Sequence, residues 1–223
     1  MIRLSNIQKA YGKNHVLRGV SLEIEDGEFI SIMGASGSGK STLLNIIGGL
    51  DRSFKGSAHV AGKDVLNLND RAISAFRNTT IGFVFQSFHL LNHLTCGQNV
   101  SLPAYFNPLL SEEEISQRVS NSLELVGLPH KRPEFPLHLS GGERQRIAIA
   151  RALFNHPRII LCDEPTGALD SKTGVQIIEL FESLNRDTGV TVILVTHSPE
   201  VSARADRVIH IEDGLIVEPS EDA

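Results

Sequence analysis

Short apolar runs, separated by glycine-containing and polar turns, recur along most of the chain. Because these runs are brief and rich in β-branched residues, they predict strands. The expected strands lie at 2–5, 20–25, 29–33, 56–60, 80–85, 158–162, 190–195, 207–211 and 215–217. Helical spacing of apolar residues at 41–47, 171–186 and 199–203 alternates with these strands. This alternation predicts an α/β fold with a mostly parallel sheet and covering helices.

Residues 88–156 follow a different pattern, in which helical spacing is interrupted by prolines at 103, 108, 129, 133 and 136. Within this segment, 111–126 predicts an amphipathic helix that Ser111 caps. We therefore expect a helical insertion at 88–156, with 1–87 and 157–223 forming the remainder of a single domain. The polar tail at 218–223 is expected to be frayed.

Composition excludes several functional classes. The 223 residues carry a formal net charge of −5, so no global basic field attracts nucleic acid, and we expect neither nucleic acid nor lipid as a direct partner. No apolar run approaches the ~20 residues of a spanning helix, and the first residues lack the features of a secretory signal. Cys96 and Cys162 lack metal-type spacing, and Cys162 ends an apolar strand as an expected core residue. This is compatible with a reducing cytoplasm.

A glycine-rich turn joins the strand at 29–33 to the helix at 41–47. It contains Gly34, Ala35, Ser36, Gly37, Ser38, Gly39, Lys40 and Ser41, and Thr42 follows. In a phosphate-binding loop of this pattern, backbone N–H groups and a helix N-terminus surround the β- and γ-phosphates. Lys40 would add its charge there, and the Ser41 hydroxyl would bind Mg²⁺. The alternative is a glycine-rich turn that binds no ligand. It would not explain why the whole phosphate-binding pattern is present, and present between a strand and a helix.

Two adjacent carboxylates, Asp163 and Glu164, follow the apolar strand at 158–162. The carboxyl end of a strand in an open α/β sheet is where ligands bind. Asp163 can hold Mg²⁺ through water, and Glu164 can polarise an attacking water. A solvated turn before Pro165 is the alternative, but the phosphate-binding loop elsewhere in the chain favours a catalytic pair.

A second potential anion site lies at 139–146, which has the sequence Leu-Ser-Gly-Gly-Glu-Arg-Gln-Arg. Ser140 is expected to cap a helix whose first turn holds Gly141, Gly142 and Glu143, so that backbone N–H groups are accessible to an anion. Taken alone, Ser140 and the two glycines could be an ordinary helix cap. One chain nevertheless carries two helix ends suited to phosphate.

The run at 139–146, together with the run from Cys162 to Asp170, resembles the signature of ABC ATPases. The resemblance covers almost the whole chain and implies a P-loop NTPase with a RecA-like core, an N-terminal antiparallel β subdomain and an inserted α-helical subdomain. It also implies binding of ATP and Mg²⁺, ATP hydrolysis, and a homodimer of ATPase subunits formed on ATP binding. The partner would be a transmembrane permease, which would hold the chain on the cytoplasmic face of the inner membrane.

The same resemblance implies roles for single residues. Tyr11 matches an aromatic residue that stacks on adenine, and Val16 would pack nearby. Gln86 matches a glutamine that contacts Mg²⁺ or the attacking water and senses the membrane partner. Asp170 matches a residue that crosses the dimer interface, and His197 matches the histidine that contacts the γ-phosphate.

Within this family the chain resembles the lipoprotein-release and macrolide-export branch (LolD/MacB-like), through 48–51, 83–91 and 139–146. The resemblance implies a separate ATPase subunit that moves the outer domain of a membrane protein with few spanning helices. Their cargo class would be lipoprotein, peptide or drug-like molecules. The chain departs from the branch at Gln98, which replaces a glutamate, and at Cys162, which replaces an alanine.

Four functions remain to be compared. The chain could be an export ATPase, the ATPase of an importer or of a cell-division complex, a nucleotide-gated adaptor, or a soluble DNA-repair or translation protein. Glu164 and His197 argue against an adaptor that hardly hydrolyses ATP. The single cassette and the absence of a basic charge argue against the last class. We therefore expect an ATPase coupled to a membrane partner.

Overall fold

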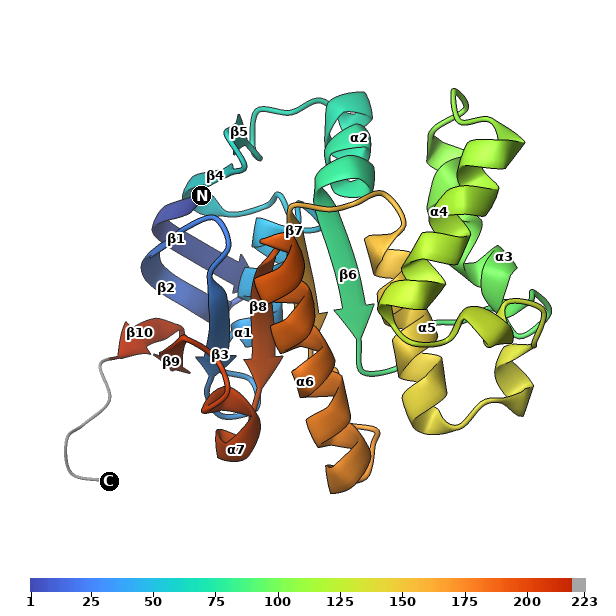
Figure 1. Cartoon of the computed structure of the whole chain (residues 1–223). Helices are drawn as coiled ribbons and strands as arrows, with labels where there is room; N and C mark the ends of the chain where they lie inside the picture. Colours follow the sequence, from blue (N-terminus) through green and yellow to red (C-terminus); the bar gives the residue numbers. More distant parts are fainter. Residues whose placement is uncertain (218–223) are drawn as a thin grey trace.

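The computed structural model describes residues 1–217, so the expected fraying of 218–223 lies outside the described residues. Two sheets lie at one side of the molecule and a group of helices at the other (Figure 1). The larger sheet has the order β10 (Leu215–Val217), β9 (Arg207–Glu212), β3 (Phe29–Met33), β8 (Thr191–Thr196), β7 (Ile159–Asp163) and β6 (Ile81–Phe85). The smaller sheet has the order β2 (Asn14–Ile24), β1 (Ile2–Tyr11), β4 (Lys55–Val60) and β5 (Lys63–Asp64).

The larger sheet is parallel from β9 through β6, as the alternation of strands and helices predicts. At its edge β10 turns back antiparallel on β9. The turn is Asp213-Gly214, and both residues have positive φ, which a tight hairpin with matching twist requires. The smaller sheet pairs antiparallel throughout. The expected α/β class with an N-terminal antiparallel β subdomain is confirmed.

Helices connect successive strands of the larger sheet along the chain. They are α1 (Lys40–Ile47), α2 (Asp70–Thr80), α3 (Cys96–Ser101), α4 (Glu112–Leu125), α5 (Gly141–Leu153), α6 (Ser171–Thr188) and α7 (Pro199–Ser202), with 3-10 turns at Leu102–Phe106, Pro129–Lys131 and Pro136–His138. Helices α3, α4 and α5 form the group beside β6, drawn in green and yellow in Figure 1. Ser111 caps α4 as predicted, and the side chain of Glu114 completes the capping box. Within residues 1–217 no helix is long and apolar enough to cross a membrane.

The predicted bounds of three strands, at 2–5, 20–25 and 80–85, were wrong. Thr80 ends a helix, α2, that the apolar spacing did not indicate; Asn69 caps this helix, and its buried face holds only Ile73 and Phe76. Strand β1 continues to Tyr11, and β2 starts at Asn14. Because this hairpin extends beyond the core, its outer half lacks the apolar run that marks a buried strand, and pairing between the strands maintains it.

Two apolar clusters lie on opposite faces of the larger sheet, because successive strand residues point to opposite faces. In β7, Ile159 and Leu161 belong to one cluster, and Ile160 and Cys162 belong to the other. Both cysteines of the described chain are free and buried, which confirms Cys162 as a core residue. Burial raises the pKa of the Cys96 thiol to about 11.

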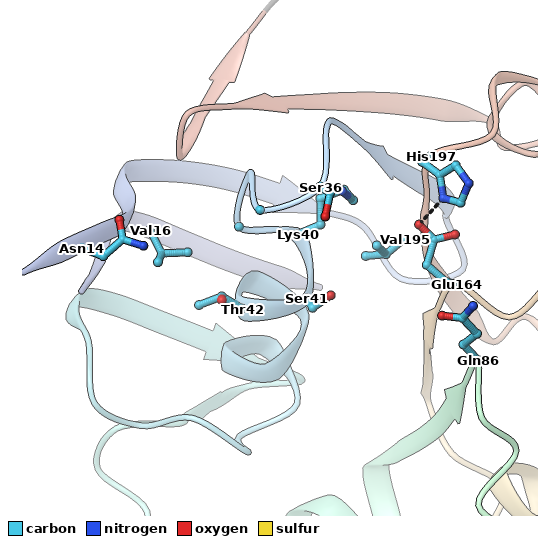
Figure 2. A pocket seen from close by; sticks show the side chains of 12 residues that line it. Asn14, Val16, Ser36, Lys40, Ser41, Thr42, Gln86, Glu164, Val195 and His197 are labelled. Atoms are coloured by element: carbon cyan, nitrogen blue, oxygen red, sulfur yellow. Dashed lines mark hydrogen bonds and ion pairs between the residues drawn. The ribbon is translucent and has the colours of Figure 1, made fainter. Parts of the chain in front are cut away.

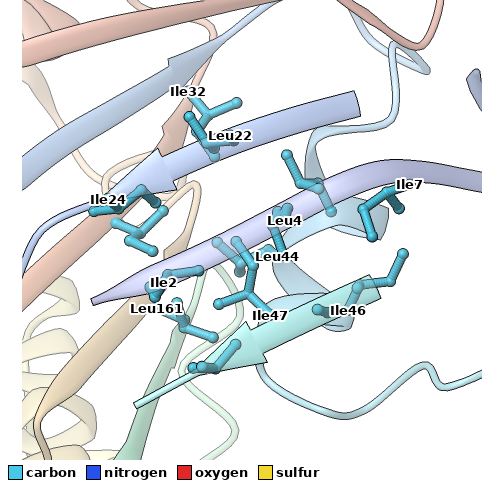
Figure 3. Close-up of a cluster of buried hydrophobic side chains, with 14 of the residues drawn as sticks. Ile2, Leu4, Ile7, Leu22, Ile24, Ile32, Leu44, Ile46, Ile47 and Leu161 are labelled. Carbon is cyan, nitrogen blue, oxygen red and sulfur yellow. The ribbon is translucent and has the colours of Figure 1, made fainter. Parts of the chain in front are cut away.

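The first cluster anchors the helix that follows the phosphate-binding loop. Leu44, Ile46 and Ile47 of α1 pack against Ile2 and Leu4 of β1 (Figure 3). Full burial of each such side chain contributes about 1.5–3 kcal/mol. Helix α1 is therefore held between the two sheets, and the position of its N-terminus is set by the core.

Candidate functional site

A cavity of about 760 Å³ lies where β3, β6, β7 and β8 end. This is the edge of an open α/β sheet at which ligands bind. Figure 2 shows Asn14 and Val16 at one end of the cavity, and Gln86, Glu164 and His197 at the other. The lining residues are Asn14, Val16, Ser36, Gly37, Gly39, Lys40, Ser41, Thr42, Gln86, Glu164, Val195 and His197.

Glycines in the loop are required by close packing and by backbone conformation. A Cβ at Gly34 would lie 2.1 Å from the carbonyl oxygen of Ile211. At Gly39, φ is 106°, and a Cβ would lie 2.7 Å from the side chain of Leu17. Side chains at these two positions would displace the loop from β9 and β2, so glycine sets the shape of the cradle.

The loop also leaves donors free for an anion. Gly39 is the N-cap of α1 and supplies no side-chain hydrogen bond to the first turn. The buried hydroxyl of Ser38 has no hydrogen-bond partner among the described residues. The Lys40 ammonium donates to the carbonyl oxygens of Gly34 and Ala35, at 2.8 and 2.9 Å, which holds its charge at the mouth of the loop. These free donors and the positive charge suit a polyphosphate.

Ser41 and Asp163 bring two oxygen donors together beside the loop. The Ser41 hydroxyl donates to Oδ1 of Asp163 at 3.0 Å. Burial, opposed by that hydrogen bond, raises the pKa of the Asp163 carboxyl. A cation at this position would offset the cost of burying the charged carboxylate. Hydroxyl, carboxylate and amide oxygens are hard donors of the type Mg²⁺ prefers, so Ser41 and Asp163, with Gln86 in the lining of the same cavity, fit this ion.

Glu164 and His197 form the far end of the cavity. Nδ1 of His197 lies 2.8 Å from Oε1 of Glu164. The Glu164 backbone has φ 49°, in the left-handed region that costs energy for a residue with a side chain, and its N–H donates to the Val195 carbonyl oxygen at 3.0 Å. Gln86 is also confined, because a Cβ at Gly167 would lie 2.8 Å from its Nε2. A carboxylate held in this way beside a phosphate site can orient and polarise a water.

The predicted signature residues do not reach this cavity within one chain. Ser140 caps α5 and accepts from the N–H of Glu143 at 3.2 Å, while the Glu143 carboxylate accepts from the N–H of Ser140 at 2.9 Å. A Cβ on Gly141 would lie 3.2 Å from the side chain of Leu169, so the start of α5 lies close to the segment after β7. Among the described residues, none of 140–143 lines the cavity.

Asp170 and Tyr11 also lie outside the lining. Asp170 caps α6 and lines a second cavity of about 330 Å³, which Glu164 and His197 border as well. Tyr11 pairs with Asn14 across the β1–β2 hairpin and therefore lies next to the lining. The sequence analysis missed Asn14 and Val195; the pairing of Asn14 with Tyr11 could have indicated the first, had the hairpin been recognised.

Comparison with known proteins agrees with this geometry. Residues 17–167 match the family model described as ABC transporter. The ABC transporter ATP-binding protein YvrO of Bacillus subtilis is 51% identical over 221 residues, covering 97% of this chain and 96% of the relative. The macrolide export ATP-binding/permease protein MacB of Escherichia coli strain K12 is 47% identical over 221 residues, covering 97% of this chain and 34% of the relative.

Solved structures extend the similarity to the whole fold. The ATP-binding cassette MJ0796, in a dimeric post-hydrolysis state bound to ADP and phosphate, has a TM-score of 0.88 and 44% identity, covering 98% of this chain and 97% of that one. The cassette cbiO1 of Clostridium perfringens has a TM-score of 0.88 and 30% identity, with 97% and 86% coverage. With the phosphate-binding loop and the acidic pair at one sheet edge, this chain belongs to the ABC transporter family and is an ATP-hydrolysing, ATP-binding subunit of the MacB/LolD-like type.

Proposed function

We propose that two copies of this chain close head to tail over two ATP molecules, and that opening after hydrolysis moves a separate transmembrane permease. The observation that carries the proposal is the separation of the two helix ends suited to phosphate. The N-terminus of α1 borders the cavity, and that of α5 does not. A two-fold axis resolves this, because Ser140 of each copy then faces the phosphate held by Lys40 of the other.

Within each site the chain's own groups take distinct roles. The loop from Gly34 to Ser41 and the charge of Lys40 bind the triphosphate, and Ser41, Asp163 and Gln86 would hold Mg²⁺. The ion, when bound, neutralises charge on the phosphates. Glu164 orients and polarises the attacking water, and His197 holds the Glu164 carboxylate and approaches the γ-phosphate. Asp170, at the start of α6, would cross to the second copy.

A groove of about 390 Å³ beside β6 is the proposed docking site for the permease. Its lining residues come mainly from α2, β6, the 3-10 turn at Leu102–Phe106 and α5, with one residue from each of the segments after α1 and after α5. They are Leu50, Ser74, Arg77, Asn78, Ile81, Gly82, Phe83, Phe85, Leu102, Pro103, Phe106, Arg151, Ala152 and Asn155. Phe106 is 73% exposed. An exposed aromatic side chain at the rim of an apolar groove suits an amphipathic helix of a partner.

Arg151 connects this groove to the ATP cavity. Its guanidinium donates to the carbonyl oxygens of Phe88 and His89, at 2.8 and 2.6 Å. Both residues have positive φ, and they lie two and three positions after Gln86. A helix that displaces Arg151 would therefore alter the backbone that carries Gln86. We propose that the segment at 88–156 shifts in this way relative to the core formed by 1–87 and 157–223.

Export or extraction of lipoprotein, peptide or drug-like cargo is the transport function that we propose. Its support is the similarity to proteins named for macrolide export, which join an ATPase to a permease in one chain. The chain would lie on the cytoplasmic face of the inner membrane through its partner, without direct contact to lipid or nucleic acid.

Purification of the tagged chain from solubilised membranes tests the partner. We expect a permease with few spanning helices and a large extracytoplasmic domain to co-purify, and Phe106→Asp to release it. Leu137→Asp is the matched control, because Leu137 is similarly exposed, at 68%, and does not line the groove. Retention of the permease by the Phe106 variant would contradict the docking site.

A further inference from the structure

A buried ion pair, Lys9 with Asp51, lies beside Tyr11 and has no part in the roles proposed above. Lys9 is 5% exposed, and its ammonium lies 2.7 and 2.6 Å from the two carboxylate oxygens of Asp51. It also donates to the carbonyl oxygen of Ser53 at 2.7 Å. A buried pair contributes little net stability, because desolvation offsets the attraction between the charges. The feature of this pair that bears on function is therefore its position next to Tyr11.

The pair holds Tyr11 at two points. The Tyr11 hydroxyl donates to Oδ2 of Asp51 at 2.8 Å, and the Lys9 ammonium lies over one ring face, 4.6 Å from the centroid. Burial and then the Asp51 hydrogen bond raise the pKa of the Tyr11 phenol, so it remains a donor. Tyr11 is still 52% exposed. The ring is thus held at its hydroxyl and by Lys9 over one face, while about half of the side chain stays exposed.

The same pair joins the ring to the helix that carries the phosphate site. The N–H of Asp51 donates to the carbonyl oxygen of Asn45 in α1, at 3.1 Å. Helix α1 begins at Lys40, in the cradle. Asn14, opposite Tyr11 in the hairpin, lines the cavity. The Tyr11 ring and the cradle are therefore parts of one connected unit.

We propose that Lys9 and Asp51 are positioning residues for the nucleotide base: they fix Tyr11 as a partly exposed platform, at a set place relative to the phosphate cradle. This inference rests on the proposed ATP site and on the contact of Tyr11 with adenine that the family resemblance implies. A platform that is fixed before binding loses less conformational entropy when the base stacks on it. The pair should thus affect ligands that carry a base, and should not affect the triphosphate alone.

The first test compares affinities for Mg-ATP and for inorganic tripolyphosphate. A single substitution leaves a buried charge unpaired, so the test uses the double variant Lys9→Met/Asp51→Asn, which removes both charges. We expect ATP to bind about three- to tenfold more weakly, since the double variant keeps the ring but loses part of its pre-ordering for stacking, and tripolyphosphate affinity to be unchanged. The control is Arg3→Met/Glu23→Gln, which removes another ion pair of the same sheet.

A double-mutant cycle with Tyr11→Ala shows whether the pair acts through the ring. Tyr11→Ala alone should weaken ATP binding by about tenfold. In that background, Lys9→Met/Asp51→Asn should cause no further loss. Equal weakening of ATP and tripolyphosphate, or a loss that persists without the ring, would overturn the positioning role.

Intrinsic fluorescence gives a second readout. The chain has no tryptophan and two tyrosines, so Tyr105→Phe leaves Tyr11 as the remaining emitter of this type. ATP, but not tripolyphosphate, should change its emission, and the double variant should reduce that change. If Tyr105→Phe binds ATP without any change in emission, the platform is wrong while the phosphate site stands. If the wild-type chain binds neither ligand, the proposed function itself fails.

Discussion

Nδ1 of His197, at the end of β8, lies 2.8 Å from Oε1 of Glu164, at the end of β7. The two side chains differ in exposure, at 74% for His197 and 19% for Glu164. The Glu164 carboxylate is thus the more buried member of the pair, and the exposed imidazole of His197 holds it in one orientation. The Glu164 backbone is also in the left-handed region. The position of this carboxylate is therefore set both by its backbone conformation and by the contact with His197.

Glu164→Gln should retain ATP binding and lose hydrolysis, because the amide preserves the shape but cannot accept a proton. Removal of a general base costs about 10²–10⁴ in rate. Phosphate release under saturating ATP measures the effect. Glu200→Gln is the control, since Glu200 borders the second cavity but not the ATP cavity. A rate within about threefold of the wild type, roughly 0.65 kcal/mol of barrier, would contradict the role of Glu164.

Lys40→Ala should remove most nucleotide binding, because the terminal phosphates lose the positive charge at the mouth of the loop. Equilibrium binding of a labelled ATP analogue checks this. Lys63→Ala, an exposed lysine of β5, controls for the loss of one charge and should bind normally. Wild-type affinity in the Lys40 variant would refute the assignment of the loop.

ATP should convert Glu164→Gln from monomer to dimer when hydrolysis is blocked, because each bound γ-phosphate bridges Lys40 of one copy and Ser140 of the other. Without ATP, two anion sites would face each other without a ligand, so association should be weak. Light scattering with and without ATP gives the mass in each state. A monomer in saturating ATP would count against the head-to-tail arrangement.

Two equivalent helix caps separate the role of Ser140 in the dimer from its role in stability. Ser140 and Ser111 each form a capping box, with Glu143 and Glu114 respectively. Either serine-to-alanine change should cost about 0.5–2 kcal/mol in the free energy of unfolding. In the Glu164→Gln background, Ser140→Ala should abolish the ATP-dependent dimer and Ser111→Ala should leave it intact. Loss of the dimer in both variants would mean that the helices act through stability alone.

The purified chain should not bind lipid vesicles without a partner. Its formal net charge is −5. An anionic vesicle would therefore repel it, and attachment is expected to come from the proposed permease. Flotation with both vesicle types is the measurement. Strong binding to either would show that membrane attachment does not depend on the permease.

Local patterns predicted those parts of the site whose geometry is encoded by a few consecutive residues. The glycine-rich turn between a strand and a helix identified the cradle, and the acidic pair after an apolar strand identified Asp163 and Glu164. The hairpin that carries Tyr11 was predicted only in its inner parts, at 2–5 and 20–25, and helix α2 was not predicted, since strand pairing maintains the first and packing against the core maintains the second. The spacing of hydrophobic residues along the chain reports neither strand pairing nor packing against the core.

The sequence by itself determined the family, the chemistry of the phosphate-binding loop and the caps of α4 and α5, because each depends on residue types at fixed short spacings. Only the tertiary structure decided which distant groups meet. It joined Ser41 to Asp163 and set His197 against Glu164, since parallel strands far apart in the chain end at one edge of the sheet. It also placed the Asp51 carboxylate within hydrogen-bond distance of the Tyr11 hydroxyl, because the core fixes α1 against β1.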